Sequence, residues 1–293
     1  MNSTQNISGR NRPFVTGCPV GCVTDMVDSG IILPDGPLRC CTFCRHLVSS
    51  CSENRYWSTM QEFDSPEGTW PSPKGIKRLV RRAGRMMATC EKLLGKKRNA
   101  IRLMDVGCSS GAFVYAAQSA GVKAEGVEPS LNPVKTAIAH GLKVHQGILE
   151  DLKLAAESFV VITLFEVVEH LKDPLQLFEE CHRVLSPDGI VIVKTGNTDS
   201  LTARMMRNRW EYFDMTLHGG HISFFNPYSL ELLAYRCGFK VGRILTRKVN
   251  FYEKNMLPYV LYRTSRFFAN ALRHPVGWLG KGHEMVVYLQ KTS

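Results

Sequence analysis

Apolar and polar positions follow one another in two ways along this chain. From residue 100 to residue 195, short apolar runs alternate with longer segments whose apolar positions recur at helical spacing. The runs predict buried strands, and the segments between them predict amphipathic helices. The predicted order is strand 101–106, helix 111–120, strand 123–128, helix 132–140, strand 142–145, strand 159–164, helix 174–185 and strand 189–194. Such alternation is typical of a doubly wound parallel sheet and predicts an α/β fold.

The pattern changes on either side of this stretch. Downstream, a helix is predicted at about residues 228–237, followed by a strand from Phe239 and a last strand near Met285–Leu289. Upstream, the prolines and glycine of DSPEGTWPSPK oppose regular structure and predict a linker before a basic helix. The predicted organisation is a cysteine-rich module at 1–63, a linker and basic helix at 64–99, and the main domain at 100–293.

Length and composition are those of a globular protein with a large core. The 293 residues are 44% hydrophobic, which is ample for one main domain and a small appendage. The sequence has no apolar run near the roughly 20 residues of a membrane-spanning helix. The polar first 30 residues also lack the apolar region of a signal peptide. We therefore expect a cytoplasmic protein.

Basic residues outnumber acidic residues by 37 to 26, which gives a net charge of +11 and a pI near 9.2. This excess favours an anionic partner. Many of the basic residues crowd the predicted helix and its flanks, from Lys74 to Arg98. A solvated helix face has the same pattern, so an anion-binding surface and an ordinary exposed surface are both open interpretations.

A glycine bend follows the first strand of the predicted main domain. The strand ends in Asp105-Val106-Gly107, and Gly111 begins an alanine-rich helix. Glycines at such a turn allow the backbone to approach a ligand closely. The turn alone does not identify the ligand, because similar turns also bind dinucleotides and phosphates. The GxGxxG and GxxxxGKS/T spacings of those sites are absent from the sequence.

A carboxylate at the end of the second strand narrows the choice. Glu128 ends this strand in the sequence EGVEPS, about twenty residues beyond the glycine bend. A carboxylate in this position can accept hydrogen bonds from both hydroxyls of a ribose. The bend and the acid together are therefore suited to hold a nucleoside.

These residues resemble the class I S-adenosylmethionine-dependent methyltransferases, whose first motif matches DVGCSSG and whose ribose-binding acid matches Glu128. The resemblance runs from about Arg102 to Phe239 and implies a Rossmann-like, seven-stranded sheet. It also implies that Asp105 orients the bend and reaches the methionine part of the cofactor. The cofactor-binding residues predicted in this way are Asp105, Gly107, Cys108, Gly111, Glu128, Pro129, Gln146, Gly147, Ile148, Phe165 and Glu166, with Gln146, Gly147 and Ile148 flanking adenine.

The segment after strand 159–164 is expected at the same edge of the sheet, where ligands bind in such folds. Its sequence EVVEHLKDP is similar to a signature of methyltransferases that act on quinones, sugars and polyketide-like acceptors. Downstream, HISFFNPYSL resembles a block of one broad methyltransferase group, with His221 at the matching position and His218 as an additional histidine. His170, His221 and His218 are therefore candidate general bases. A purely structural hydrogen-bonding role is the alternative for each.

Two cysteine pairs in the first 60 residues predict a metal site. Cys18 and Cys22 form one pair and Cys41 and Cys44 the other, with 18 residues between the pairs. Four thiolates at such spacing suit tetrahedral zinc in a ribbon, although the first pair has three intervening residues instead of two. Disulfides and an iron–sulfur cluster are the alternatives, and a reducing compartment disfavours disulfides. The substitute ligands are Cys40, Cys51 and His46, whereas Cys90, Cys108, Cys181 and Cys237 are expected to be core residues.

The ribbon and the main domain together resemble bacterial C- and O-methyltransferases of deoxysugar and related biosynthesis. The expected function is methyl transfer from S-adenosylmethionine to a hydroxyl or carbon of a small-molecule acceptor. RNA methylation is an alternative, because positive charge and a zinc module suit nucleic acid. The sequence lacks the Asn/Asp-Pro-Pro-aromatic motif of many nucleobase amine methyltransferases, which argues against such a target. A non-catalytic binding module is a second alternative.

An aromatic and basic stretch at residues 251–282 precedes the last predicted strand. Core packing would explain its aromatic side chains. The same composition also suits an acceptor pocket or peripheral contact with anionic lipid.

Overall fold

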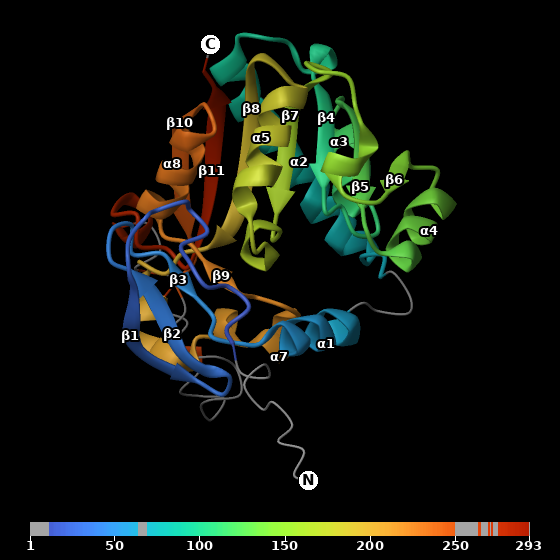
Figure 1. Ribbon diagram of the computed structural model, residues 1–293. Helices are drawn as coiled ribbons and strands as arrows, with labels where there is room; N and C mark the ends of the chain where they lie inside the picture. The colour runs from blue at the N-terminus through green and yellow to red at the C-terminus, as the bar shows by residue number, and fades with distance from the viewer. Residues whose placement is uncertain are drawn as a thin grey trace.

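The computed structural model describes residues 12–63, 69–249, 263–264, 269, 271 and 275–292 (Figure 1). These residues form a large sheet flanked by helices and a smaller sheet near one edge of it. Among the helices of the described residues, none has both the length and the apolar character needed to cross a membrane.

Seven strands make up the large sheet. They are β4 (Arg102–Val106), β5 (Lys123–Glu128), β6 (Val144–Gln146), β7 (Phe159–Phe165), β8 (Leu185–Gly196), β10 (Phe239–Arg247) and β11 (Glu284–Lys291). Their order in space is β10-β11-β8-β7-β4-β5-β6. The five strands from β8 to β6 are parallel, whereas β11 runs antiparallel to both of its neighbours. The sheet confirms the predicted α/β, Rossmann-like fold.

Helices cover both faces of this sheet. They are α2 (Pro73–Leu94), α3 (Ala112–Ser119), α4 (Leu131–Ala139), α5 (Pro174–Val184) and α8 (Pro227–Arg236). Alternate strand residues point to opposite faces. Leu103 and Ile192 pack in a core with α2 and α3, whereas Met104 and Val191 pack in a second core with α5 and α8. Burial on both faces explains why the strands read as continuous apolar runs.

The basic helix α2 has a defined beginning and end. The Ser72 side chain accepts a hydrogen bond from the Gly75 amide, and Pro73 occupies the first turn, where its missing N–H costs no helical bond. Gly95 ends the helix in a left-handed conformation with φ of 63°. The predicted helix is confirmed and begins two residues before the predicted Gly75.

The small sheet joins segments that are far apart in the sequence. It contains β1 (Met26–Leu33), β2 (Gly36–Cys41), β3 (Leu47–Val48) and β9 (Ser223–Phe224), all paired in an antiparallel manner in this order. Leu38 and Leu47 pack there with Trp210 and Phe213 from the chain that follows β8. The amino-terminal residues therefore share a core with the segment between β8 and α8.

Shorter helices connect these parts. They are α1 (Glu53–Phe63), α6 (Leu201–Met206), α7 (Met215–His218) and the 3₁₀ turns η2 (Arg98–Ala100), η3 (Leu149–Leu152), η4 (Val168–His170), η5 (Arg207–Arg209) and η6 (Glu211–Phe213). In Figure 1, α1 and α7 lie side by side below the large sheet. Part of the predicted linker, residues 64–68, and most of the aromatic and basic stretch at 251–282 lie outside the described residues.

Candidate active site

The predicted cofactor residues gather at the carboxyl edge of four adjacent parallel strands. Asp105 lies near the end of β4, Glu128 ends β5, Gln146 ends β6 and Phe165 ends β7. Because these strands are neighbours in the order β7-β4-β5-β6, their carboxyl ends meet on one side of the sheet. Ligands bind at this edge in open α/β sheets.

The glycine bend after β4 is pinned to β5. The amides of Gly107 and Cys108 donate to the Val127 carbonyl at 2.9 and 3.1 Å. Gly107 and Gly111 have φ of 67° and 76°, in the left-handed region that favours glycine. A Cβ on Gly107 would lie 2.7 Å from Val167 Cγ2, so a side chain there would have to displace its neighbour. The bend thus keeps bare backbone at the strand edge.

Glu128 faces this bend directly. Its carboxylate accepts hydrogen bonds from the Ser109 amide at 2.9 Å and the Ser130 amide at 3.0 Å, which fixes its orientation. The Gly147 amide donates to the Glu128 carbonyl at 3.0 Å and so ties the end of β6 to the same point. Pro129, Gln146 and Ile148 are exposed beside it, while the Cys108 side chain is buried. A ribose and an adenine could thus be held on adjoining surfaces.

Asp105 is a buried acid at the centre of the edge. Thr163 donates to its Oδ1 at 2.5 Å. Burial raises the pKa of Asp105 to about 7, and the negative charge of Glu128 acts in the same direction, whereas the Thr163 bond and the Arg82 charge oppose them. A cationic group bound nearby would favour its ionised form.

Arg82 on α2 was not singled out by the sequence. Its guanidinium lies over the Phe165 ring at 5.1 Å, and burial lowers its pKa. Within the described part of the chain, its buried Nη2 has no hydrogen-bond partner. The sequence does contain a sign of this role. Arg82 follows Leu79 by three residues and precedes Met86 by four, so this spacing places a charge on the apolar stripe of the helix.

The two glutamates of the EVVEH segment, Glu166 and Glu169, both contact the Tyr212 hydroxyl. The Tyr212 hydroxyl lies 3.0 Å from Glu166 Oε2 and also bonds Glu169, while Thr195 Oγ1 is 2.9 Å from it. Glu166 has a φ of 55° and forms an ion pair with Lys194, whose pKa burial lowers to about 8. Sequence reasoning gave Tyr212 no role, although it lies in the aromatic run WEYF.

The three candidate histidines form one cluster. The His221 ring lies 4.7 Å from that of His170 and is stacked on that of His218 at 4.8 Å. His221 Nδ1 is 2.9 Å from the Tyr212 carbonyl, which fixes the neutral ring with its proton on Nδ1. Burial lowers the pKa of His221 to about 3 and lowers the pKa values of His170 and His218 as well.

Three buried polar atoms around this cluster have no hydrogen-bond partner among the described residues. They are Glu169 Oε2, His170 Nδ1 and His218 Nε2. Buried polar atoms are nearly always satisfied, so unpaired ones at a single place indicate where a polar ligand or water would bind. The cluster is therefore the candidate acceptor site of the predicted enzyme.

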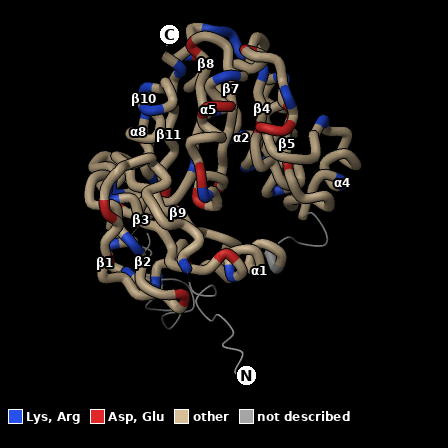
Figure 2. Tube along the Cα trace, viewed as in Figure 1, with Lys and Arg blue, Asp and Glu red and all other residues tan. Residues whose placement is uncertain are grey.

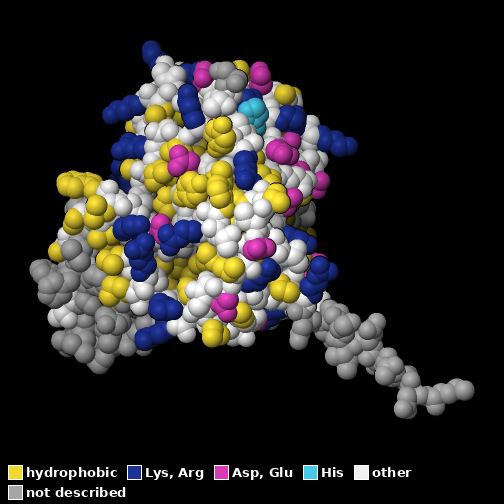
Figure 3. Space-filling view, turned by 60° about the vertical axis from the view of Figure 1, so that its left-hand side comes forward, with side chains coloured by type: hydrophobic (Ala, Val, Ile, Leu, Met, Phe, Trp, Pro, Cys, Tyr) yellow, Lys and Arg dark blue, Asp and Glu magenta, His cyan; other side chains and the backbone are white. Residues whose placement is uncertain are grey.

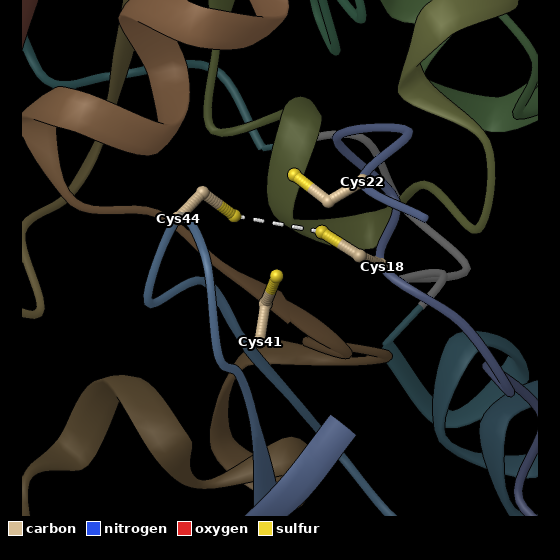
Figure 4. A group of neighbouring side chains, drawn as sticks. All are labelled: Cys18, Cys22, Cys41 and Cys44. Carbon is tan, nitrogen blue, oxygen red and sulfur yellow. Dashed lines mark hydrogen bonds between the residues drawn. The ribbon is translucent and has the colours of Figure 1, made fainter. Parts of the chain in front are cut away.

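The two predicted cysteine pairs converge. Figure 4 shows the side chains of Cys18, Cys22, Cys41 and Cys44 pointing toward one another, and their Sγ atoms all lie within 4.8 Å of each other. All four side chains are buried. Four sulfurs from two turns, with Sγ atoms of Cys18 and Cys44 3.5 Å apart, fit a tetrahedral zinc site.

The alternative ligands lie elsewhere. Cys40 Sγ points to the Cys41 carbonyl, and His46 Nε2 lies 2.9 Å from Ser223 Oγ. Cys51 packs in a separate core with Val15 and Ile222. The remaining four cysteines are buried, which confirms that they are core residues; they are Cys90, Cys108, Cys181 and Cys237.

Charged side chains are spread over the molecule. Figure 2 shows acidic positions between basic ones on both sheets, and Figure 3 shows a face where basic, acidic and apolar side chains are interspersed. On α2, Lys77, Arg78, Arg81 and Arg85 are exposed. On the faces shown, this distribution favours a solvated surface over a continuous groove for nucleic acid.

Comparison with known proteins agrees with this geometry. A family model described as a methyltransferase domain matches residues 78–243. A ubiquinone biosynthesis O-methyltransferase of Haemophilus ducreyi is 30% identical over 154 residues, which cover 47% of this chain and 63% of the relative. A protein with the same name in Azorhizobium caulinodans is 27% identical over 212 residues, or 64% of this chain and 82% of the relative.

Solved structures share the fold. A putative sarcosine dimethylglycine methyltransferase from Galdieria sulphuraria has a TM-score of 0.51 at 16% identity and covers 82% of this chain and 98% of its own. An S-adenosylmethionine-dependent methyltransferase from Mesorhizobium loti has a TM-score of 0.50 at 18% identity, covering 73% and 98%. The alignment with the Haemophilus relative spans less than two thirds of that protein's length.

Proposed function

Because this chain belongs to the methyltransferase domain family, we propose that it transfers a methyl group from S-adenosylmethionine to a small-molecule acceptor. The observation that carries the proposal is the contact between the glycine bend and Glu128, where the Ser109 amide bonds the carboxylate at 2.9 Å. This contact brings a ribose-binding acid and an open stretch of backbone to one strand edge.

In the proposed complex, the residues predicted from the sequence hold the cofactor. Glu128 binds the ribose hydroxyls, and residues 146–148 flank the adenine. Asp105 receives the amino group of the methionine part, because a buried carboxylate is best stabilised by a cation. To these residues we add Arg82, whose unpaired Nη2 can bind the carboxylate of the cofactor's methionine part. Phe165 and Glu166 lie between the cofactor and the acceptor.

When bound, S-adenosylmethionine supplies an electrophilic methyl group on sulfur, so the protein has mainly to align the acceptor in line with it. The histidine cluster removes the acceptor's proton. We assign this role to His170, whose Nδ1 is unpaired among the described residues. His221 orients the site, since its Nδ1 is already bonded and its pKa of about 3 makes it a weak base.

A hydroxylated acceptor fits this site. The unpaired Glu169 Oε2 can accept a hydrogen bond from an acceptor hydroxyl, and His218 Nε2 can bond a second polar group. The O-methyltransferase names of the relatives support an oxygen acceptor. RNA is not favoured by the interspersed surface charges.

The four converging cysteines support a structural zinc ion as part of the proposal. They supply four sulfur ligands and leave no position for substrate, which is typical of structural zinc sites. Metal analysis of the purified protein is expected to give about one zinc per chain. A folded protein that contains no zinc when purified without a chelator, and that takes up none when zinc is added, would refute this part.

Titration calorimetry with S-adenosylmethionine tests the core of the proposal. We expect micromolar binding that weakens at least about tenfold in Glu128→Gln, because the ribose loses an ionic acceptor. The acceptor can then be sought by incubating the protein with methyl-labelled cofactor and fractionated small-molecule extracts, with His170→Ala as the inactive control. An absence of cofactor binding in the wild type would refute the proposed function.

A further inference from the structure

The residues 219–226, which we call the histidine loop because they carry His221, are bonded at several points to the cysteine module, residues 12–63. The Ser49 amide donates to the Ile222 carbonyl at 2.9 Å. β9 of the loop pairs with β3 of the module, with Val48 opposite Ser223. His46 Nε2 lies 2.9 Å from Ser223 Oγ in a fully buried contact.

The opposite side of the loop contacts the acceptor side of the active site. The Ile222 amide donates to the Glu169 carbonyl at 3.0 Å, so Ile222 is bonded to both sides. The neighbouring His221 reaches the Tyr212 carbonyl at 2.9 Å and lies against the His170 ring. The loop thus connects the cysteine module to the histidine cluster, in addition to the direct bond from the Tyr56 hydroxyl to the His170 carbonyl at 3.0 Å.

The anchors of the loop come from the turn that carries two of the cysteines. The Cys41 amide donates to the His46 carbonyl at 2.9 Å, which closes the turn just before His46. The Cys44 carbonyl accepts a hydrogen bond from Asn226 Nδ2 at 3.1 Å. Because Cys41 and Cys44 belong to the sulfur cluster, the geometry of the cluster sets where the loop is held.

The cofactor side is held by different elements. The glycine bend is bonded to Val127 on β5, and Glu128 is bonded to the amides of Ser109 and Ser130. The hydrogen bonds that hold the glycine bend and Glu128 therefore come from residues outside the cysteine module, although the four cysteines share a hydrophobic core with Val106 and Val127. Loss of a hydrogen bond between the module and the histidine loop can thus alter the acceptor half while the bonds of the cofactor half stay in place.

We infer that the cysteine module positions the acceptor histidines, with His46 and the Cys44 carbonyl among the contacts that hold the histidine loop in register. The inference rests on the proposed function, since it assigns the module to the acceptor half of that site. His46, Ser223 and Asn226 are positioning residues: they act through His221 and Ile222. Zinc held by the four cysteines would order the loop and leave cofactor affinity unchanged.

Two single substitutions remove these contacts with little other change. Ser223→Ala removes the partner of His46. Asn226→Ser removes the donor to the Cys44 carbonyl without burying a charge, and its hydroxyl oxygen can still accept from the Ser229 amide and cap α8. In each variant we expect the rate of amide hydrogen exchange across residues 219–226 to rise about tenfold, because one hydrogen bond is lost. We also expect the NMR signals of the His221 imidazole to shift. Thr246→Val, which removes both hydrogen bonds of a buried hydroxyl on β10, away from the loop, is the control.

The cofactor gives the second readout. We expect both variants, and wild type stripped of zinc by a chelator, to bind S-adenosylmethionine with an affinity within about twofold of that of untreated wild type. In all three proteins the amides of the histidine loop should exchange faster. Unchanged loop exchange in both variants would overturn the inference. So would a loss of cofactor affinity in step with loop protection, because the module would then stabilise the whole fold. Failure of wild type to bind the cofactor would instead refute the proposed function, since loop exchange is measured without it.

Discussion

Gly107 and Gly141 share a left-handed backbone, with φ of 67° and 73°, but differ in their surroundings. A Cβ on Gly107 would lie 2.7 Å from Val167 Cγ2, whereas one on Gly141 would meet no atom within 4 Å. Alanine at either position costs about 1–3 kcal/mol through backbone strain. We expect Gly107→Ala also to move the bend away from the cofactor and weaken binding at least about tenfold by calorimetry.

Gly141→Ala is the matched control for this effect. It imposes similar strain at a position after α4 that is not part of the bend. A lower melting temperature with unchanged cofactor affinity is expected. If both variants bind the cofactor equally weakly, strain in the fold and not obstruction of the bend is responsible.

The raised pKa of Asp105 predicts a pH dependence of cofactor binding. At a pKa of about 7, this carboxyl is mostly protonated at pH 6 in the free protein. A bound ammonium group favours the carboxylate, so binding below pH 7 releases a proton and must strengthen as the pH rises. We expect affinity to increase about fivefold from pH 6 to pH 7 and about tenfold from pH 6 to pH 8, and to level off above pH 8. Calorimetry in two buffers of different ionisation enthalpy would count the released proton.

Asp105→Asn provides the comparison, because its amide cannot ionise. Binding should be weaker at pH 8 and nearly independent of pH between 6 and 8. The pKa of Asp105 in the folded protein is higher than its ordinary value near 3.9. The protonated carboxyl therefore stabilises the folded state at low pH, and this stabilisation is lost as the pH rises from about 4 through 7. A wild-type affinity that falls with rising pH would contradict the assignment of Asp105.

At the residue scale, sequence indicated those site residues that end apolar strands. Asp105 and Glu128 stand at positions where a polar side chain interrupts a buried run, so the pattern itself marks them. Tyr212 carries no such mark, and Arg82 is marked only by its place on the apolar stripe of α2. Their importance comes from tertiary burial, which places an unpaired guanidinium nitrogen and a phenol between two glutamates at the site.

Helix α2 combines one buried cation with an exposed basic face. Arg82 is partly buried over Phe165, whereas its neighbour Arg81 is exposed. We expect Arg82→Gln to weaken cofactor binding by about tenfold or more, because a hydrogen bond to a charged group contributes about 1.5–3 kcal/mol. Arg81→Gln should bind normally. Equal effects of the two variants at low salt, both lost at high salt, would show a general effect of helix charge instead.

Most helices and strands of the main domain could be predicted, because their apolar positions recur with a clear helical or strand period. The strand ending at Glu128 matches β5 in both of its bounds. β8 begins at Leu185, four residues before the predicted strand, although Pro187 and Gly189 suggest a turn there. The two-residue β9 has no pattern of its own and exists because β3 pairs with it.

At the scale of the whole molecule, the sequence showed the cysteine pairs but not where their module packs. The composite core of Leu38, Leu47, Trp210 and Phe213 joins segments more than 150 residues apart, and no local pattern encodes such a partnership. Sheet order in the main domain could be expected only through the resemblance to a known family. The division into a module and a main domain stays a prediction.

The proposed zinc site predicts that the stability of the molecule depends on metal. Cys41→Ser removes one of four sulfur ligands, whereas Cys40→Ser changes the adjacent cysteine, whose Sγ points to a backbone carbonyl. We expect Cys41→Ser to lose zinc and Cys40→Ser to keep about one zinc per chain. Metal bound at 100 times its Kd contributes about 2.7 kcal/mol, so Cys41→Ser and chelator-treated wild type should unfold at similarly lower denaturant concentrations.

The pair of variants also separates metal binding from packing. Both substitutions exchange sulfur for oxygen at the end of β2, so a shared loss of stability would come from packing and not from the ion. Zinc added back should restore the wild type and Cys40→Ser but not Cys41→Ser. Because the turn that carries Cys41 and Cys44 leads directly into β3, which pairs with β9, loss of the metal should first expose amides of β3 and β9, before those of the large sheet. Simultaneous exposure of both sheets would mean that the molecule unfolds as one unit and that the metal stabilises all of it.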